Sequence, residues 1–156
     1  MSLKTKIKQK EAQIGVIGLG YVGLPLAIEF AKAGFSVTGI DIDESKVAKI
    51  NAGENYIPDI EDDTLQTLVK SNNLRATKDM DVIADLDAVT ICLPTPLSKV
   101  GDPDISYIIT AIDVINKGIH KDLLIILEST TYPGTTREIV FSRLEKSVLI
   151  VGKDYY

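Results

Sequence analysis

Three glycines near the start of the chain have a spacing that could bind a phosphate group. Gly18, Gly20 and Gly23 lie in the stretch IGVIGLGYVGLPLAIEF, after an apolar run and before a pattern typical of a helix. In such a strand–turn–helix unit the first glycine allows a tight turn. The second lets a pyrophosphate approach the backbone, and the third lets the helix pack closely on the strand. The free N–H groups at the helix N-terminus favour the same phosphate. A turn without a ligand is the alternative interpretation.

A carboxylate follows at a distance that suits a dinucleotide site. Asp41 lies at the end of the next predicted strand, 21 residues after Gly20, where it could accept hydrogen bonds from the adenosine ribose hydroxyls. Its charge would repel a 2′-phosphate and no arginine follows directly, so the pattern favours NAD over NADP. Lys46 is near enough to tolerate such a phosphate. Alternatively, Asp41 could be only a residue at the entry to a helix, with Asp43 or neither of the two as the ribose ligand.

Two further strand ends should lie beside the glycine turn. The stretch LPTP, residues 93–96, and the stretch ESTTYPG, residues 128–134, each follow an apolar run. In a doubly wound sheet, ligands bind outside the carboxyl ends of the strands. Hydroxyl groups in these two stretches could therefore contact the nicotinamide half of a dinucleotide: Thr95, Ser129, Thr130 and Thr131. Serine and threonine also cap helices and fill turns, which is an equally good explanation for each of them.

The elements that must position these residues alternate along the chain. Short branched apolar runs predict strands at residues 13–18, 35–41, 74–79, 88–94, 123–130 and 147–152. Helical patterns lie between them, at residues 21–34, 43–53, 63–73, 106–118 and 131–146. This alternation is typical of right-handed βαβ units, so we predict a doubly wound α/β fold with a mostly parallel sheet of about six strands. The length of 156 residues suits a single domain.

Composition limits the possible partners and locations. Hydrophobic residues make up 45% of the chain and charged residues 25%, and no apolar run approaches the roughly 18 residues of a membrane span. The net charge of −5 argues against nucleic acid and anionic membranes as partners. Residues 1–12 are polar and basic, lack the apolar stretch of a signal peptide, and should only lead into the first strand. The single cysteine, Cys92, fits a reducing cytoplasm.

Other residues that could do chemistry have simpler explanations. Cys92 lies within an apolar strand and should be a core residue. His120 should be exposed in a turn. The acidic run Glu61–Asp63 should begin a helix, and we expect no metal site because no convergent partners are evident.

Five ordered motifs together resemble the UDP-glucose/GDP-mannose 6-dehydrogenase family. They are IGVIGLGYVGLPLA, GIDI, LRATKD, ICLPTPL and LESTTYPGTTREIV, and the resemblance runs from Gln13 to Tyr156. The form ESTTYPGTT is most similar to the bacterial branch that acts on UDP-N-acetylhexosamines. A 3-hydroxyacid-type dehydrogenase would share a similar N-terminal domain, but ESTTYPGTT argues against it.

The resemblance implies an activity and assigns roles to residues. Members of the family oxidise the C6 alcohol of a nucleotide sugar to a carboxylate in two NAD-dependent steps. Thr130 would help to position a catalytic water or the reacting oxygen. The other positions would bind NAD: Gly18, Leu19, Gly20, Tyr21, Val22 and Gly23 at the pyrophosphate, Asp41 and Lys46 at the ribose, and Leu93, Pro94, Thr95, Ser129 and Thr130 along the rest of the cofactor. The full-length enzyme would act on a UDP-sugar and could form a homodimer.

The chain is shorter than the family's pattern. A catalytic glutamate, a central region with a lysine and an asparagine, and a second domain with a cysteine nucleophile have no counterpart here. Cys92 lies in the wrong domain, and Glu138 does not match the glutamate's motif. We therefore expect residues 13–156 to be the NAD-binding domain, catalytically incomplete by itself. A stand-alone nucleotide-binding module without catalysis is the alternative, which a reading frame ending at Tyr156 would favour.

Overall fold

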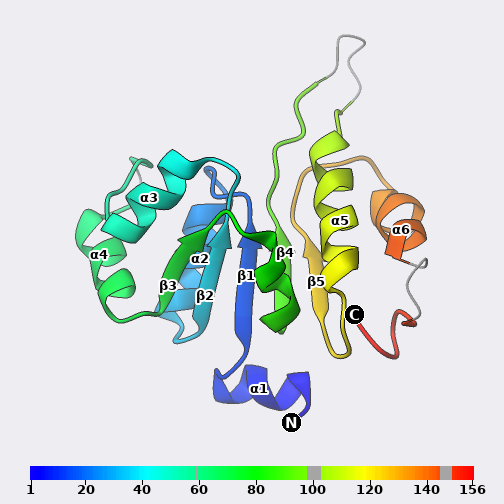
Figure 1. Ribbon diagram of the computed structural model, residues 1–156. Helices are drawn as coiled ribbons and strands as arrows, with labels where there is room; N and C mark the ends of the chain where they lie inside the picture. Colours follow the sequence, from blue (N-terminus) through cyan, green and yellow to red (C-terminus); the bar gives the residue numbers. More distant parts are fainter. Residues whose placement is uncertain (59, 98–102, 145–148) are drawn as a thin grey trace.

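The centre of the molecule is a parallel sheet of five strands in the order β3-β2-β1-β4-β5 (Figure 1). The structure, a computed structural model, describes residues 1–58, 60–97, 103–144 and 149–156. The strands are β1 Gln13–Ile17, β2 Ser36–Ile40, β3 Leu74–Thr77, β4 Ala88–Ile91 and β5 Leu124–Leu127. All four strand pairs are parallel, and the order reverses between β1 and β4. The predicted doubly wound fold is confirmed, with five described strands where about six were expected.

Helices lie between the strands at the predicted positions, together with two helical segments that were not predicted, at residues 3–9 and 80–85. They are α1 Leu3–Gln9, α2 Gly23–Lys32, α3 Glu44–Ala52, α4 Asp62–Lys70, α5 Ser106–Gly118 and α6 Ser142–Leu144, with a 3₁₀ helix η1 at Met80–Asp85 and a π-helix η2 at Thr136–Phe141. Glu61 directly precedes α4, as expected for the start of a helix. Within the described ranges, none of these helices combines the length and apolar character needed to cross a bilayer.

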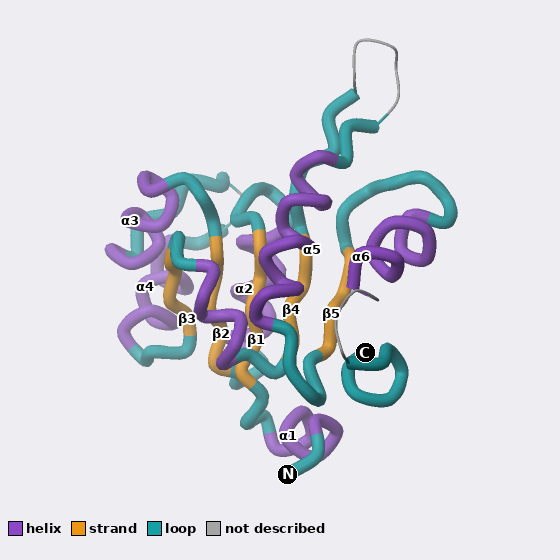
Figure 2. Tube along the Cα trace, turned by 45° about the vertical axis from the view of Figure 1, so that its right-hand side comes forward, coloured by secondary structure: helices purple, strands orange, loops and turns teal. Residues whose placement is uncertain are grey.

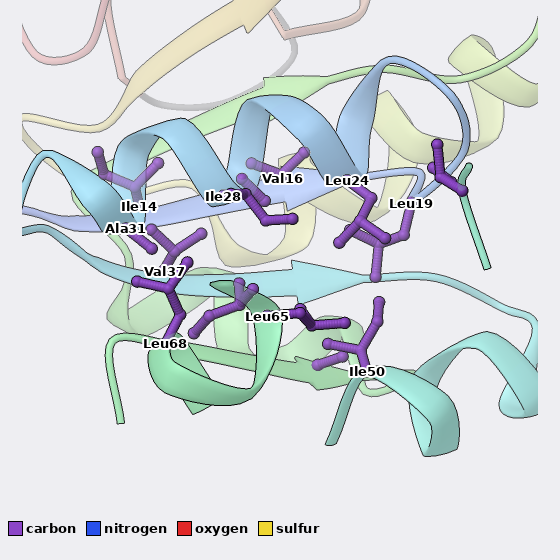
Figure 3. Packing of buried hydrophobic residues seen from close by; sticks show 14 of the residues in the cluster. Ile14, Val16, Leu19, Leu24, Ile28, Ala31, Val37, Ile50, Leu65 and Leu68 are labelled. Carbon is purple, nitrogen blue, oxygen red and sulfur yellow. The ribbon is translucent and has the colours of Figure 1, made fainter. Parts of the chain in front are cut away.

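Helices cover both faces of the sheet, as the two views agree (Figure 1 and Figure 2). Successive residues of β1 point to opposite faces, so Val16 packs with α2, α3 and α4, whereas Ile17 packs with η1 and α5. Figure 3 shows the first of these clusters, in which Leu24 of α2, Leu65 of α4 and Ile50 of α3 gather against β1 and β2. These two cores hold the strand ends in fixed relative positions.

The residues before β1 form a docked helix, where the sequence suggested only a lead-in. Helix α1 lies beside the N-terminal ends of the strands (Figure 1). Lys6 Nζ lies 2.6 Å from Asp87 Oδ1, and the Gln13 amide donates to the other carboxylate oxygen of Asp87 across 2.9 Å. One carboxylate before β4 therefore holds both α1 and the start of β1.

The predicted final strand is wrong for the part of it that the structure describes. Residues 147 and 148 lie outside the described ranges, and Leu149–Gly152 contains only an isolated bridge from Val151 to Tyr155. The edge of β5 is contacted instead by Tyr156. Its amide donates to the Leu123 carbonyl across 2.9 Å, and its carbonyl accepts from the Ile125 amide across 2.6 Å. Residues 149–152 therefore form no ladder with β5, and Tyr156 bonds to this edge instead.

Candidate functional site

A cleft of about 850 Å³ opens where β1, β2, β4 and β5 end. This is the point where the strand order reverses, and open α/β sheets bind ligands there. Most of the predicted site residues line it: Gly18, Gly20, Tyr21, Val22, Asp41, Lys46, Leu93, Pro94, Thr95, Ser129 and Thr130. Leu19 and Gly23 are not part of the lining. Asp43, the alternative ribose ligand, also lines the cleft, as do residues that were not predicted to bind a ligand: Ile42, Tyr56, Ile57, Cys92, Tyr107 and Glu128.

Gly18, Gly20 and Gly23 have different structural roles. Gly18 has a φ of +90°, and a Cβ there would lie 2.6 Å from the Cys92 carbonyl oxygen. A Cβ on Gly23 would overlap the carbonyl oxygen of Gly18, so this position allows α2 to pack against the turn. A Cβ on Gly20 would meet nothing within 4 Å. The first and third glycines therefore serve the fold, whereas the second leaves open space beside the backbone.

That open space fits a pyrophosphate. It lies at the N-terminus of α2, where helical N–H groups have no partner within the helix. No hydrogen bond among the described residues engages the amides of Tyr21 and Val22. Unpaired donors and the partial positive charge of the helix end favour an anion at this position.

Leu19 holds the glycine loop from behind. Its amide donates to Asp41 Oδ2 across 2.8 Å, and its carbonyl accepts from the Tyr56 hydroxyl across 2.5 Å. Its side chain is fully buried, and the missing side chain of Gly39 makes room for it, since a Cβ there would lie 2.7 Å from Leu19 Cδ2. The loop is thus fixed through the amide, the carbonyl and the buried side chain of Leu19.

Asp41 and Asp43 have different partners. The Asp41 side chain is 8% exposed; its Oδ1 accepts from the Asp43 amide across 3.0 Å, and Lys46 Nζ lies 3.4 Å from its Oδ2. The Asp43 side chain accepts from the Ser45 and Lys46 amides and caps α3. The Asp43 carboxylate is therefore engaged as the N-cap of α3. Asp41 lines the cleft, and a carboxylate with about four lone-pair sites has room for a further donor.

The hydroxyl groups at the ends of β4 and β5 are mostly bound to backbone. Ser129 Oγ accepts from the Leu93 amide across 2.9 Å and donates to the Ile91 carbonyl. Thr95 Oγ1 donates to the Thr130 carbonyl across 2.7 Å. These bonds join the two strand ends. Thr130 lines the cleft and its hydroxyl bonds to no described group, whereas Thr131 is not part of the lining.

Burial keeps the cleft's thiol and phenol protonated. Cys92 is 8% exposed, and burial together with the charge of Glu128 raises its pKa to about 11. The predicted core role of Cys92 is confirmed. Burial raises the pKa of Tyr56 above its usual range, and the charges of Asp41 and Asp43 add to this. At neutral pH the Tyr56 hydroxyl therefore remains a donor to Leu19.

His120 is not the exposed residue that the sequence suggested. It is half-buried, and its ring nitrogens lie 2.9 Å from the carbonyl oxygens of Leu86 and Lys121. It is not part of the cleft lining. Among the described residues, no group of histidine, cysteine, aspartate and glutamate side chains could hold a metal ion.

The chain is similar to known proteins over almost its whole length. Residues 12–153 match the model of the UDP-glucose/GDP-mannose dehydrogenase family, NAD binding domain. A UDP-N-acetyl-D-mannosamine dehydrogenase of Pyrococcus horikoshii is 38% identical over 92% of this chain and 34% of its own length. A UDP-N-acetyl-D-glucosamine 6-dehydrogenase of Pseudomonas aeruginosa is 32% identical over 94% of this chain and 34% of its own length.

Solved structures show the same similarity. The Pyrococcus horikoshii UDP-D-ManNAc dehydrogenase superposes with a TM-score of 0.86 at 38% identity, over 92% of this chain and 34% of that one. A ternary complex of GDP-mannose dehydrogenase from Pseudomonas aeruginosa gives 0.84 at 32% identity, with the same coverage of 92% and 34%. The chain thus spans about a third of the length of these relatives. It belongs to the UDP-glucose/GDP-mannose dehydrogenase family, whose NAD-binding domain it forms.

Proposed function

We propose that this chain is the cofactor-binding part of a nucleotide-sugar 6-dehydrogenase that oxidises the C6 alcohol of a UDP-N-acetylhexosamine to the uronate. The observation that carries the proposal is the open backbone at Gly20, at the N-terminus of α2 and in one cleft with the Asp41 carboxylate. The relatives that act on UDP-N-acetylmannosamine and UDP-N-acetylglucosamine support the substrate class. The overall oxidation uses one water and two molecules of NAD, each of which accepts one hydride.

The residues of this chain contribute binding and orientation. The amides of Tyr21 and Val22 would donate to the pyrophosphate, and Asp41 would accept from the ribose hydroxyls. Leu93, Pro94 and Thr95 would line the side of the cofactor, with Gly18 behind the turn. The Thr130 hydroxyl, which bonds to no described group, would hold a water or the reacting oxygen of the sugar. Lys46 would act through Asp41 by fixing the position of its carboxylate.

The first test is a calorimetric titration of the purified chain with NAD and, separately, with NADP. We expect NAD to bind and NADP to bind at least about tenfold more weakly, because a 2′-phosphate would meet the Asp41 charge. ADP-ribose should bind as well, because it keeps the groups that Gly20 and Asp41 would contact. Absence of binding for all three ligands would contradict the proposed cofactor site.

A second test concerns turnover. We expect the 156-residue chain to produce no NADH, followed by absorbance, when it is given NAD with UDP-N-acetylglucosamine or UDP-N-acetylmannosamine. We also propose that the NAD-binding domain spans residues 13–156 and that residues 1–12 form the segment before it. Detectable NADH formation would show that the chain is catalytically complete and would overturn this part.

The assembly and location belong to the proposal as well. We infer a cytoplasmic protein, supported by the single buried thiol, and a homodimer in the longer enzyme, supported by the family resemblance. Light scattering of the purified chain and of a longer form would check the dimer. A longer form that is monomeric at micromolar concentration would contradict it.

A further inference from the structure

We propose that Glu128 makes the site prefer the oxidised over the reduced cofactor, by placing a negative charge beside the nicotinamide ring. This inference rests on the proposed function, because it takes NAD as the ligand. It concerns a residue to which the sequence assigned no role.

Glu128 lies at the end of the cleft that the adenosine half would leave free. The open backbone at Gly20 and the Asp41 carboxylate follow β1 and β2, on one side of the strand-order reversal. Glu128 directly follows β5, and its amide donates to the Ile91 carbonyl of β4 across 3.0 Å. A dinucleotide with its pyrophosphate at Gly20 spans such a crevice, so its second nucleotide extends toward β4 and β5.

No described residue neutralises the Glu128 carboxylate at this end of the cleft. The residue is exposed, and its side chain forms no ion pair or hydrogen bond with a described residue. Among the described lining residues, the other charged ones are Asp41, Asp43 and Lys46, all on the side of β2 and α3. The carboxylate also lies near enough to Cys92 to contribute to the raised pKa of that thiol. Its field therefore acts within the cleft at the β4–β5 end.

The oxidised and reduced cofactors differ at the ring that this field would reach. The nicotinamide ring is positively charged in NAD and neutral in NADH, whereas the adenosine, pyrophosphate and riboses are the same. A carboxylate within several ångströms of the ring stabilises the charged form and leaves the neutral form almost unaffected. At intermediate effective dielectric and physiological salt, such a pair should be worth about threefold to tenfold in affinity.

The test measures dissociation constants of NAD, NADH and ADP-ribose for the wild-type chain and for Glu128→Gln. We expect the substitution to reduce the preference for NAD over NADH by about threefold to tenfold. ADP-ribose has no nicotinamide ring, so its affinity should change by less than about twofold. Glu128→Lys should shift the preference further in the same direction, because its charge would repel the oxidised ring.

Glu11→Gln is the matched control. It removes the same charge from an exposed residue just before β1, at the end of the strands opposite the cleft, whose side chain has no partner among the described residues. This variant should keep the wild-type preference for NAD over NADH.

A preference that is equal in Glu128→Gln, Glu11→Gln and the wild type would overturn the inference while leaving the NAD site intact. An equal loss of ADP-ribose affinity in Glu128→Gln would also overturn it, because the residue would then act on the other half of the ligand. A wild-type chain that binds none of the three ligands would refute the proposed function itself.

Discussion

The Leu19 amide and the Asp41 carboxylate are joined by a hydrogen bond of 2.8 Å, which ties the glycine loop to the end of β2. The carboxylate proposed to bind the ribose therefore also holds the loop proposed to bind the pyrophosphate. Removing this carboxylate should therefore lower both the affinity for NAD and the free energy of unfolding.

Replacing Asp41 with alanine should weaken NAD binding by about 1–3 kcal/mol, because the ribose hydroxyls lose a charged acceptor. The free energy of unfolding should also fall, by about 1–3 kcal/mol, since the Leu19 amide is left without its partner. Calorimetric titration and denaturant unfolding measure the two effects. An unchanged dissociation constant would count against Asp41 as the ribose ligand.

Asp43→Ala is the matched comparison for that experiment. Asp43 caps α3 through the Ser45 and Lys46 amides, so its removal should cost about 1 kcal/mol of stability. We expect the NAD dissociation constant to change by less than about threefold, because the Asp41 carboxylate remains. If Asp43→Ala weakened NAD binding more than Asp41→Ala did, Asp43 would be the ribose ligand.

Gly20→Ala and Gly23→Ala should separate binding from folding. The added Cβ at Gly20 meets open space, so the variant should keep its stability within about 0.5 kcal/mol and lose at least about tenfold in NAD affinity. The added Cβ at Gly23 overlaps the Gly18 carbonyl oxygen, so this variant should be strongly destabilised or unfolded. Circular dichroism melts and titrations would check both. A Gly20→Ala chain that binds NAD like the wild type would place the pyrophosphate elsewhere.

Tyr56 should make the protein sensitive to alkali. Burial raises its pKa above the unfolded value of about 10, so above that pH the unfolded chain releases a proton that the folded chain retains. The stabilisation from this neutral phenol is complete below about pH 10 and is lost as the pH rises toward the folded pKa. A Tyr56→Phe variant has no phenol to ionise, so its unfolding free energy does not fall in this way as the pH rises. It also lacks the hydrogen bond to the Leu19 carbonyl, so it is less stable than the wild type at neutral pH. Its deficit in unfolding free energy should therefore shrink between about pH 9 and pH 11, as measured by urea unfolding.

Tyr21→Phe is the control for the alkaline series, because the Tyr21 side chain is 78% exposed. We expect its unfolding free energy to follow the wild type across the same pH range. A constant difference between wild type and Tyr56→Phe would argue that the phenol is not buried in the folded protein.

Cys92 should be slow to react with alkylating reagents. With a pKa of about 11, about one thousandth of the thiol is ionised at pH 8, against about a quarter in an unfolded chain. We expect iodoacetamide to modify the folded chain at least about 100-fold more slowly than the chain in denaturant, followed by mass spectrometry. Similar rates in both conditions would mean that the core around Cys92 opens readily.

The sequence predicts the strands and the glycine turn well, because their signals are local. The apolar residues of β1 and β2 adjoin glycines and Asp41 within a short stretch, so the position of the turn follows from the pattern itself. The run at Leu149–Gly152 has the same apolar character but no sheet position. Ile150 and Val151 are 56% and 37% exposed. Whether an apolar run joins a sheet depends on whether an edge is free, and a local pattern contains no such information.

The parts of the site that the sequence did not predict depend on contacts between distant residues. Tyr56 reaches the Leu19 carbonyl across 37 positions from a loop without periodicity. The Ser129 hydroxyl, predicted to contact the cofactor, also accepts a hydrogen bond from the Leu93 amide 36 positions away and so links two strand ends. The sequence shows that Tyr56 and Ser129 are present, but the groups that they bond to depend on the order of the strands in the sheet.

The place of α1 determines how this protein can be attached to a surface. Met1 is 74% exposed and lies with α1 near the starts of the strands, whereas the cleft opens where the strands end (Figure 1). A tag or tether at Met1 would leave the cleft facing solution. The backbone of Tyr156 is hydrogen-bonded to the edge of β5, so a tether at that end would pull on the sheet. Immobilised binding measurements on this chain should therefore use the N-terminus.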